Sequence, residues 1–417
     1  MIDSFYICSG QGDLIFERSY GEAYPRSLCD DFFLTVTKTD EKVPMKPMIY
    51  SEQHDCFLFY YQQHNLVYMI ATKTEAPALL FSKFLEHVDR VLCDFFGEKA
   101  VDQKVRQNFI YLFMLMEELI DGGYPNITEP NLIKEMLETP GFTGYSAGTV
   151  ISNPKLPDSM SSPMYWRKSK VVYVQNEVFI DINETFNASF GSEGVIQNSH
   201  ISGEIQCTAK LSGVPDLTMQ FENPSIMDDV SLHPCVRYFR WNQSKVVSFV
   251  PPDGMFTLLR YRAGATSAAV PPPISVRPEF LVQTGSARFF LGVAARNTRS
   301  LPVEDCYIDF KMPRCIKSCG ASCSVGGFTY DVSTHLGRWV VNRLPLTGEI
   351  TIQGTMDFED KDTICEERPI ACLHFKIPNF TASSLKLTKL DLSPDTTYKM
   401  YKGLKTLTLS GNYEVRF

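Results

Sequence analysis

The sequence of 417 residues contains no apolar run of 18 or more residues, the length that a membrane-spanning helix needs. Its first twenty residues also lack the basic segment and apolar core of a secretory signal peptide. We therefore expect a cytoplasmic protein without a membrane span. In that compartment thiols stay reduced, so we expect the 12 cysteines to be free rather than paired in disulfides.

An excess of positive charge is also missing. Forty Lys and Arg residues stand against 48 Asp and Glu residues, which gives a formal net charge of −8 and excludes a globally basic nucleic-acid binder. The charge is unevenly divided, because residues 1–150 carry 12 basic and 22 acidic side chains while the remainder carries 28 and 26. The two parts are therefore expected to face different partners.

Motifs for catalysis, cofactors and metals are scarce. The chain has no Gly-x-x-x-x-Gly-Lys-Ser/Thr phosphate loop and no His-Glu-x-x-His, so we expect no cofactor and no metal site. Gly144 to Gly148 match the Gly-x-Ser-x-Gly nucleophile elbow, with Ser146 as the nucleophile. The motif needs a strand before it and a helix after it, and neither pattern flanks this match. A serine hydrolase using Ser146 remains a remote alternative.

Three cysteines, Cys315, Cys319 and Cys323, follow one another at intervals of four residues. A zinc site needs a fourth ligand and usually a second Cys or His pair, and no such pair lies close by. The segment is rich in Gly and Ser, which predicts a solvated hairpin loop rather than a metal site.

The N-terminal part combines strand and helix patterns. Residues 1–20 predict a hairpin, residues 28–36 a short amphipathic segment, and residues 56–61 and 65–71 two further strands. Apolar residues then recur at helical spacing between Leu80 and Phe95, in residues 105–120, and again in residues 131–137. We predict an α+β domain over residues 1–140.

A linker is predicted over residues 141–164, because 16 of the 24 positions from 140 to 163 are Gly, Pro, Ser, Thr, Asn or Asp. From Tyr165 onward, short alternating apolar segments follow one another between turn residues, without a competing helical pattern. Residues 165–417 therefore predict an all-β domain, most simply a sandwich that splits into subdomains.

One of these strands has an unusual face. Between Asn176 and Ile182, alternation places Val178, Ile180 and Ile182 on one face, with Phe179 and Asp181 on the other. An aromatic ring beside a carboxylate could form a pocket that accepts a hydroxyl group. On the residues alone, an ordinary solvent face with one exposed Phe is the simpler interpretation.

Three segments resemble the mu-homology domain of adaptor-complex medium chains: YWRKSKVVYVQNEVFIDI (165–182), KLSGVPDLTMQFENPSIMDDVSLHPCVRYFRW (210–241) and VVSFVPPDGMFTLLRYR (246–262). The N-terminal part is similar to the longin domain that medium chains carry. Among medium chains, DDVSLHPCVR and the C-terminal KGLKTLTLSGNYEVRF are most similar to the mu chain of the third adaptor complex.

This resemblance implies a non-enzymatic subunit of a heterotetrameric vesicle coat, with two large subunits and one small subunit as partners. It implies a peripheral position on trans-Golgi and endosomal membranes and transport toward lysosome-type organelles. The cargo would be cytosolic tails with Tyr-x-x-Φ signals, where Φ is a bulky apolar residue. The domain would contain a core subdomain (165–262 and 381–417) and an inserted subdomain (263–380).

The resemblance also implies the binding residues. The tyrosine pocket would contain Phe179, Asp181, Thr208 and Lys405. The Φ pocket and backbone edge would be formed by Val178, Ile180, Leu387, Leu390, Lys402 and Leu404. A peptide is expected to lie along residues 402–406, with both of its key side chains entering pockets on the same side.

The sequence departs from the plasma-membrane medium chain in this pocket. Thr208 replaces a Lys, Gly403 a Trp, and Lys405 an Arg, so an aromatic wall is missing and a stacking guanidinium becomes a point charge. These departures leave open the alternative of a structural subunit without a working pocket.

Overall fold

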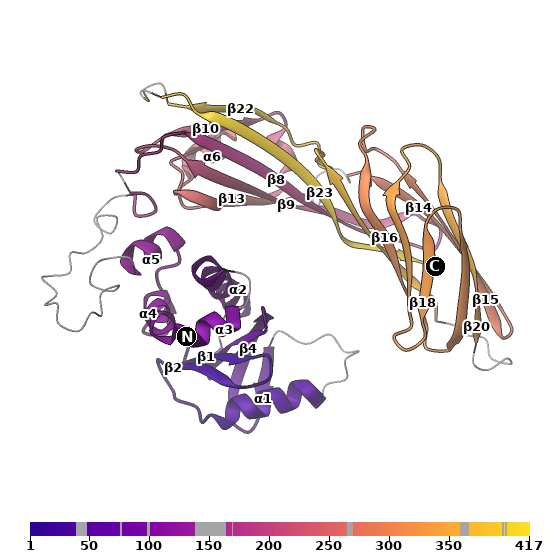
Figure 1. The fold of residues 1–417 in the computed structure, drawn as a ribbon, viewed down its shortest axis with the longest axis horizontal. Helices are drawn as coiled ribbons and strands as arrows, with labels where there is room; N and C mark the ends of the chain where they lie inside the picture. The colour runs from indigo at the N-terminus through magenta and orange to yellow at the C-terminus, as the bar shows by residue number, and fades with distance from the viewer. Residues whose placement is uncertain are drawn as a thin grey trace, which may run out of the picture. The chain divides into compact units, whose positions relative to one another are not determined.

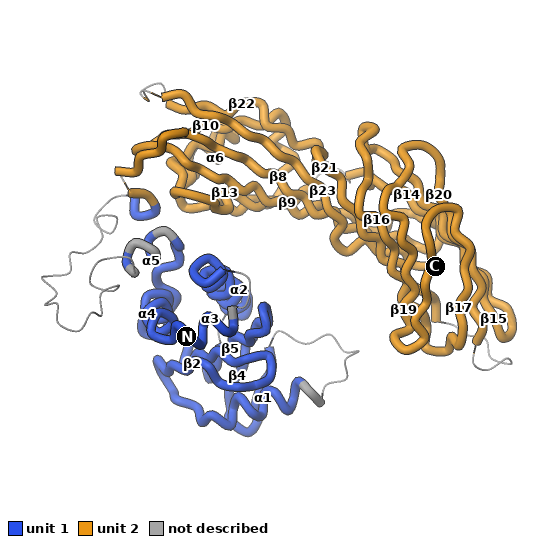
Figure 2. Tube along the Cα trace, in the orientation of Figure 1, with its two compact units in different colours: residues 1–166 blue, residues 167–417 orange. Residues whose placement is uncertain are grey.

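The computed structural model describes residues 1–38, 48–75, 77–97, 101–137, 164–168, 170–264, 270–358, 367–393, 396 and 398–417. The chain divides into two compact units, Met1–Trp166 and Arg167–Phe417 (Figure 2). Ser146 and all of the predicted linker except Met164 lie outside the described residues. The predicted domain boundaries therefore remain predictions.

The first unit contains a five-stranded antiparallel sheet in the order β2-β1-β5-β4-β3. Its elements are β1 (Ser4–Ser9), β2 (Leu14–Ser19), α1 (Ser27–Lys38), β3 (Met48–Ser51), β4 (Cys56–Gln63), β5 (Leu66–Thr72), α2 (Ala78–Phe96), α3 (Val101–Gln107), α4 (Phe109–Leu119), β6 (Ile120–Asp121), β7 (Tyr124–Pro125) and α5 (Pro130–Leu137).

Helices cover both faces of this sheet (Figure 1). Central strand β5 is buried along its whole length: Val67 and Met69 pack with α1, and Tyr68 and Ile70 pack with α2 and α4 on the opposite face. The alternation of a strand thus supplies two separate cores, one per face. The predicted α+β class of this part is confirmed.

The first unit differs from the prediction in its short strands and in one helix. Strands β3, β6 and β7 were not predicted, and the single helix predicted over residues 105–120 is two helices, α3 and α4, separated at Asn108. The Asn108 side chain donates a hydrogen bond of 2.8 Å to the Lys104 carbonyl, and its backbone leaves helical geometry at φ −116° and ψ 42°. An Asn side chain that competes for backbone partners commonly interrupts a helix in this way.

The second unit is built almost entirely of strands. Its elements are β8 (Glu177–Phe190), β9 (Ile196–Lys210), β10 (Leu217–Phe221), the 3₁₀ turn η2 (Pro224–Ile226), β11 (Asp229–Leu232), α6 (Tyr238–Ser244), β12 (Val247–Phe249), β13 (Gly254–Ala263), β14 (Ile274–Gln283), β15 (Ser286–Ala295), β16 (Val303–Lys311), β17 (Ile316–Cys323), β18 (Gly327–Asp331), β19 (Leu336–Leu344), β20 (Ile350–Phe358), β21 (Ile370–Pro378), β22 (Leu387–Leu392) and β23 (Tyr401–Arg416).

The largest sheet of this unit has nine strands in the order β11-β13-β9-β8-β23-β21-β16-β19-β18. A four-stranded sheet, β14-β15-β20-β17, shares a large hydrophobic core with one part of it, and a three-stranded sheet, β12-β10-β22, forms a further layer. The long strands β8, β9 and β23 run through much of the unit (Figure 1). The predicted β-sandwich class is confirmed, with the short helix α6 as an unpredicted addition.

The cysteine-rich segment is a strand and not the predicted hairpin loop. Cys319 and Cys323 lie in β17, which pairs with β20, and both side chains pack partly against the large core. Burial alternates along this part of β17, so two residues that are four positions apart lie on the same side of the strand, and both thiols are half-buried. Cys315 is disulfide-bonded, so the prediction that every cysteine is free is wrong at this residue.

No helix in the described part of the chain is both long enough and apolar enough to cross a lipid bilayer.

Candidate functional site

Strand β8 places Phe179 and Asp181 on the partly exposed face of the nine-stranded sheet. Burial alternates strictly along the strand, with Val178 and Ile180 fully buried and the two intervening side chains half-buried. The strand therefore has the two faces that the sequence predicted, with Val178 and Ile180 on one and Phe179 and Asp181 on the other.

On this face, paired residues of the adjacent strands β9, β8 and β23 form two rows: the first contains Phe179 and the second contains Asp181. Phe179 lies between Thr208 of β9 and Gly403 of β23. Asp181 lies between Gln206 of β9 and Lys405 of β23. Adjacent residues in a sheet share a face, so the four residues predicted for the tyrosine pocket come together here.

The edge of β23 is open where these rows end. On one side, β23 pairs in parallel with β8 from Tyr401 onward. On its other side, β21 pairs with it only from Leu407 onward, and Thr406 accepts a backbone hydrogen bond of 2.8 Å from Asn379. Within the described residues, positions 401–405 thus have a strand neighbour on one side only, which leaves an edge that an added peptide strand can pair with.

An aromatic pair borders the first row. The Phe179 ring lies over Gly403, since a Cβ atom at position 403 would be only 2.3 Å from its Cδ1 atom. Tyr401, 64% exposed, lies next to Phe179 with ring centroids 5.9 Å apart and an interplanar angle of 57°. Tyr401 therefore supplies an aromatic wall that sequence reasoning missed, although its place two residues before Gly403 puts it on the same face.

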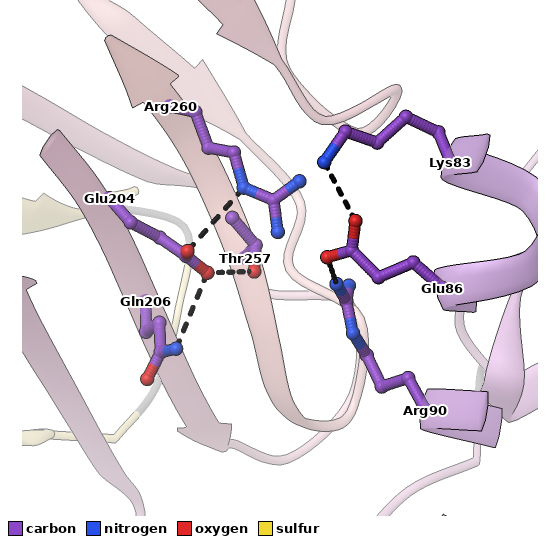
Figure 3. Close-up of polar contacts among 7 residues, drawn as sticks. All are labelled: Lys83, Glu86, Arg90, Glu204, Gln206, Thr257 and Arg260. Atoms are coloured by element: carbon purple, nitrogen blue, oxygen red, sulfur yellow. Dashed lines mark hydrogen bonds and ion pairs between the residues drawn. The ribbon is translucent and has the colours of Figure 1, made fainter. Parts of the chain in front are cut away.

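The second row leaves the Asp181 carboxylate available. Gln206, its neighbour on β9, instead donates a hydrogen bond of 3.3 Å to Glu204, which also accepts one of 2.6 Å from Thr257 (Figure 3). No hydrogen bond or ion pair among the described residues engages the Asp181 carboxylate.

The Glu204 cluster is a stable polar neighbour of the site. Burial acts to raise the pKa of Glu204, but the hydrogen bonds from Thr257 and Gln206 and the charge of Arg260 outweigh it, so its pKa lies below the ordinary value. Arg260 approaches Glu204 at 3.4 Å (Figure 3). Glu204 therefore remains ionised and keeps Gln206 engaged.

Most of the predicted Φ residues belong to the opposite face of the same sheet or to strand β22, which Lys402 contacts. Leu404 lies beside Ile180, and Lys402 beside Val178. Strand β22 contributes the half-buried Leu387 and the buried Leu390. The Lys402 ammonium donates a hydrogen bond to the Leu390 carbonyl and lies 3.6 Å from an Asp391 carboxylate oxygen.

The expectation that both pockets lie on one side is wrong. Phe179 and Asp181 alternate with Val178 and Ile180, so the two groups of residues lie on opposite faces of the sheet. An extended peptide presents residues at positions 0 and +3 on opposite faces, because its side chains alternate with a period of two. The corrected arrangement therefore matches the spacing of a Tyr-x-x-Φ signal.

Comparisons with known proteins agree over the whole chain. A family model described as the adaptor complexes medium subunit family matches residues 164–417. The AP-3 complex subunit mu of Dictyostelium discoideum is 32% identical over 426 residues, with 100% of both chains covered. The AP-3 complex subunit mu-2 of Homo sapiens is 31% identical over 421 residues, again with 100% of both chains covered.

A solved structure described as a homology model of the full-length AP-3 complex in an intermediate open conformation has the same fold. Its TM-score is 0.61 at 19% identity, and the match covers 99% of each chain. The resemblance inferred from the quoted sequence segments is confirmed by these matches.

Proposed function

This chain belongs to the adaptor complexes medium subunit family, and from this premise we propose that it selects membrane cargo bearing Tyr-x-x-Φ signals. Medium subunits of adaptor complexes are structural trafficking proteins and not enzymes, so the serine hydrolase alternative is set aside. The observation that carries the proposal is the open edge of β23, with an aromatic and carboxylate site on one face and an apolar site on the other.

In the proposed complex, a cargo peptide extends along residues 401–405 and adds a strand to the sheet. Its tyrosine ring packs against the contacting pair of rings formed by Phe179 and Tyr401, and the phenolic hydroxyl donates to Asp181. Three residues later, the Φ side chain turns to the other face and packs against Leu404 and Leu390.

Binding is expected to be weak. Burial of the tyrosine and of an aliphatic Φ residue contributes roughly 1.5–3 kcal/mol each, and a hydrogen bond to a carboxylate contributes about 1.5–3 kcal/mol. Ordering a flexible peptide and losing its translational freedom offset much of this gain. A dissociation constant on the order of micromolar follows.

We also propose that the first unit is the assembly domain, with two large subunits and one small subunit as partners in a coat peripheral to trans-Golgi and endosomal membranes. The transport route would lead toward lysosome-type organelles. Support comes from the first eight residues of α4, 109–116, which are all hydrophobic: Leu112, Leu115 and Met116 are buried, while Ile110 and Phe109 are 70% and 47% exposed. Such a helix is normally covered on every side, here by a large subunit.

A second candidate function is a structural subunit without a working pocket. Two observations favour it: the Phe179 ring occupies the space above Gly403, and Lys402 is already held by Leu390 and Asp391 on the Φ face. In this case the chain would assemble into the coat and leave cargo selection to other subunits.

Calorimetric titration separates the two candidates. The full-length chain is titrated with a Tyr-x-x-Leu peptide, with the same peptide carrying Phe for Tyr, and with its phosphotyrosine form. Cargo selection predicts micromolar binding of the first, weaker binding of the second and none of the third, because a phosphate dianion would face Asp181. Equal affinity for all three, or no binding at millimolar concentration, would favour the structural role.

A further inference from the structure

A cluster in the first unit brings together three side chains that commonly bind metals. Among the described residues, His64, Asp89 and Cys93 form the only group with three such donor atoms within 4.8 Å of one another. His64 lies in the turn between β4 and β5, and the other two lie one helical turn apart on α2. The cluster lies in a different unit from the proposed peptide site.

The distances suit a tetrahedral ion. The His64 Nδ1 atom lies 3.1 Å from the Asp89 Oδ1 atom and 3.5 Å from the Cys93 Sγ atom. Zinc bonds to nitrogen and oxygen of about 2.0–2.2 Å and to sulfur of about 2.3 Å place tetrahedral ligand atoms about 3.3–3.6 Å apart. The two distances from His64 are within a few tenths of an ångström of these spacings, and all three donor atoms lie within 4.8 Å of one another.

The His64 ring nitrogen connects the other two donors. Its Nδ1 atom is within hydrogen-bond distance of both the Asp89 Oδ1 atom and the Cys93 Sγ atom. A cation between the three atoms would interact favourably with all of them. Imidazole, thiolate and carboxylate are together a donor set typical of zinc.

The surrounding residues hold the donors in place. His64 and Asn65 both have positive φ, 52° and 60°, and the turn is anchored by a backbone hydrogen bond of 2.8 Å from Gly10 to the Asn65 carbonyl. Tyr68 donates a hydrogen bond of 2.9 Å to Asp89, whose side chain is 8% exposed. A hydrogen bond of this kind, donated from outside the cluster, orients a carboxylate ligand.

Another acidic side chain of α2, Glu86, is already paired with basic residues. Glu86 pairs with Lys83 at 2.7 Å and with Arg90 at 3.3 Å (Figure 3). It therefore does not compete for a cation in this cluster. The His64 side chain is 27% exposed, which gives an ion a route from solvent.

We propose that His64, Asp89 and Cys93 bind one zinc ion, with the fourth coordination position left to water or to a donor from another molecule. On binding, the Cys93 thiol and the His64 Nδ1 atom release any protons they carry to solvent, and the zinc–sulfur and zinc–nitrogen bonds form. The ion ties the β4–β5 turn to α2, which stabilises the first unit.

The test uses cobalt as a spectroscopic substitute for zinc on the full-length chain. Cobalt should bind at one equivalent with a thiolate-to-cobalt charge-transfer band and the visible bands of a tetrahedral site, and zinc should displace it. His64→Asn, which tolerates the positive φ, and Cys93→Ser should each weaken binding at least tenfold, and Cys93→Ser should remove the charge-transfer band.

The matched control is His54→Gln. His54 also pairs with a carboxylate, Asp31, at 3.0 Å but is not part of the three-donor cluster, so this variant should bind cobalt like the wild type. Circular dichroism of each metal-free variant checks that it folds. Absence of the charge-transfer band in the wild type, or its persistence in Cys93→Ser through another cysteine, would overturn the proposal.

Discussion

At the residue scale, Asp181 is the group on which the proposed peptide site depends most. Asp181→Ala removes the acceptor for the tyrosine hydroxyl, and a hydrogen bond to a charged group contributes about 1.5–3 kcal/mol, so we expect at least tenfold weaker peptide binding. Asn183→Ala, two residues further along the same face of β8, is the matched control and should bind like the wild type. Calorimetry measures both; equal affinity of Asp181→Ala and wild type would refute the pocket assignment.

Tyr401 provides a second test at this scale. Its ring lies 5.9 Å from that of Phe179, and it is the aromatic side chain that borders the site from β23, where Gly403 has none. Aromatic pairs contribute roughly 0.5–1.5 kcal/mol beyond burial, so Tyr401→Ala should weaken binding of the peptide about threefold to tenfold. Tyr401→Phe keeps the ring and should bind nearly normally; a loss as large as that of the Ala variant would show that the ring is not what matters.

The residues on each strand face could be predicted from the sequence, but their partners could not. Alternation alone assigned Phe179 and Asp181 to one face of β8. The same alternation, applied to Tyr401 and to the signal peptide, would have identified the aromatic wall and placed the two pockets on opposite faces. The expectation of two pockets on one side was therefore an error in applying the rule. The cluster of His64, Asp89 and Cys93 is different: a turn between strands and a helix supply these residues, so only folding brings them together.

At the element scale, the parallel pairing of β8 with β23 creates the site. Asp181 and Lys405 are neighbours in this pairing although more than half of the chain separates them. No local pattern specifies which distant strand pairs with β8, and only the resemblance to medium chains linked the two segments. The sequence therefore predicted a β-sandwich from turn and strand patterns, but not the strand order that places an open edge beside Phe179.

A buried carboxylate joins three elements near this site and gives the fold a pH dependence. Glu184 of β8, 1% exposed, accepts hydrogen bonds of 2.6 Å from the Tyr261 hydroxyl on β13 and 3.0 Å from the backbone of Ser383, just before β22. Burial raises the pKa of Glu184 despite the opposing effect of these donors.

The sign of the effect follows from the raised pKa. At pH below the ordinary carboxyl pKa of about 4.3, Glu184 is protonated in both the folded and the unfolded chain, so its ionisation does not lower the free energy of unfolding. As pH rises through the raised native pKa, the unfolded chain ionises more readily, and the native state loses stability relative to it. Glu184→Gln cannot ionise, so its free energy of unfolding relative to the wild type should rise between pH 4 and pH 7. Denaturant titrations at several pH values measure this; a constant difference would contradict it.

At the scale of the whole molecule, the breaker-rich composition of residues 140–163 predicts where proteases cut first. Limited proteolysis should give two stable fragments that correspond to Met1–Trp166 and Arg167–Phe417, because each unit has its own hydrophobic core. Mass spectrometry of the early fragments checks this. Early cleavage inside either unit, while this segment stays intact, would count against the two-unit organisation.

Single substitutions should also remove assembly or cargo binding one at a time, since the proposed assembly surface and the peptide site lie in different units. Ile110 is 70% exposed on α4, and Ile110→Glu places a charge on the apolar surface while keeping a good helix former, so the helix should persist. We expect this variant to lose most co-purification with the large subunits and to keep its affinity for the Tyr-x-x-Leu peptide. Asp181→Ala should show the reverse.

The matched control for the added charge is Gln107→Glu, at an exposed position on the neighbouring helix α3, which should assemble normally. A loss of both activities in Ile110→Glu, with normal thermal unfolding, would mean that the assembly surface and the peptide site depend on each other. Normal assembly of Ile110→Glu would instead show that the apolar side chains of α4 serve some other contact, because an ionised carboxylate in a tightly packed apolar interface costs several kcal/mol.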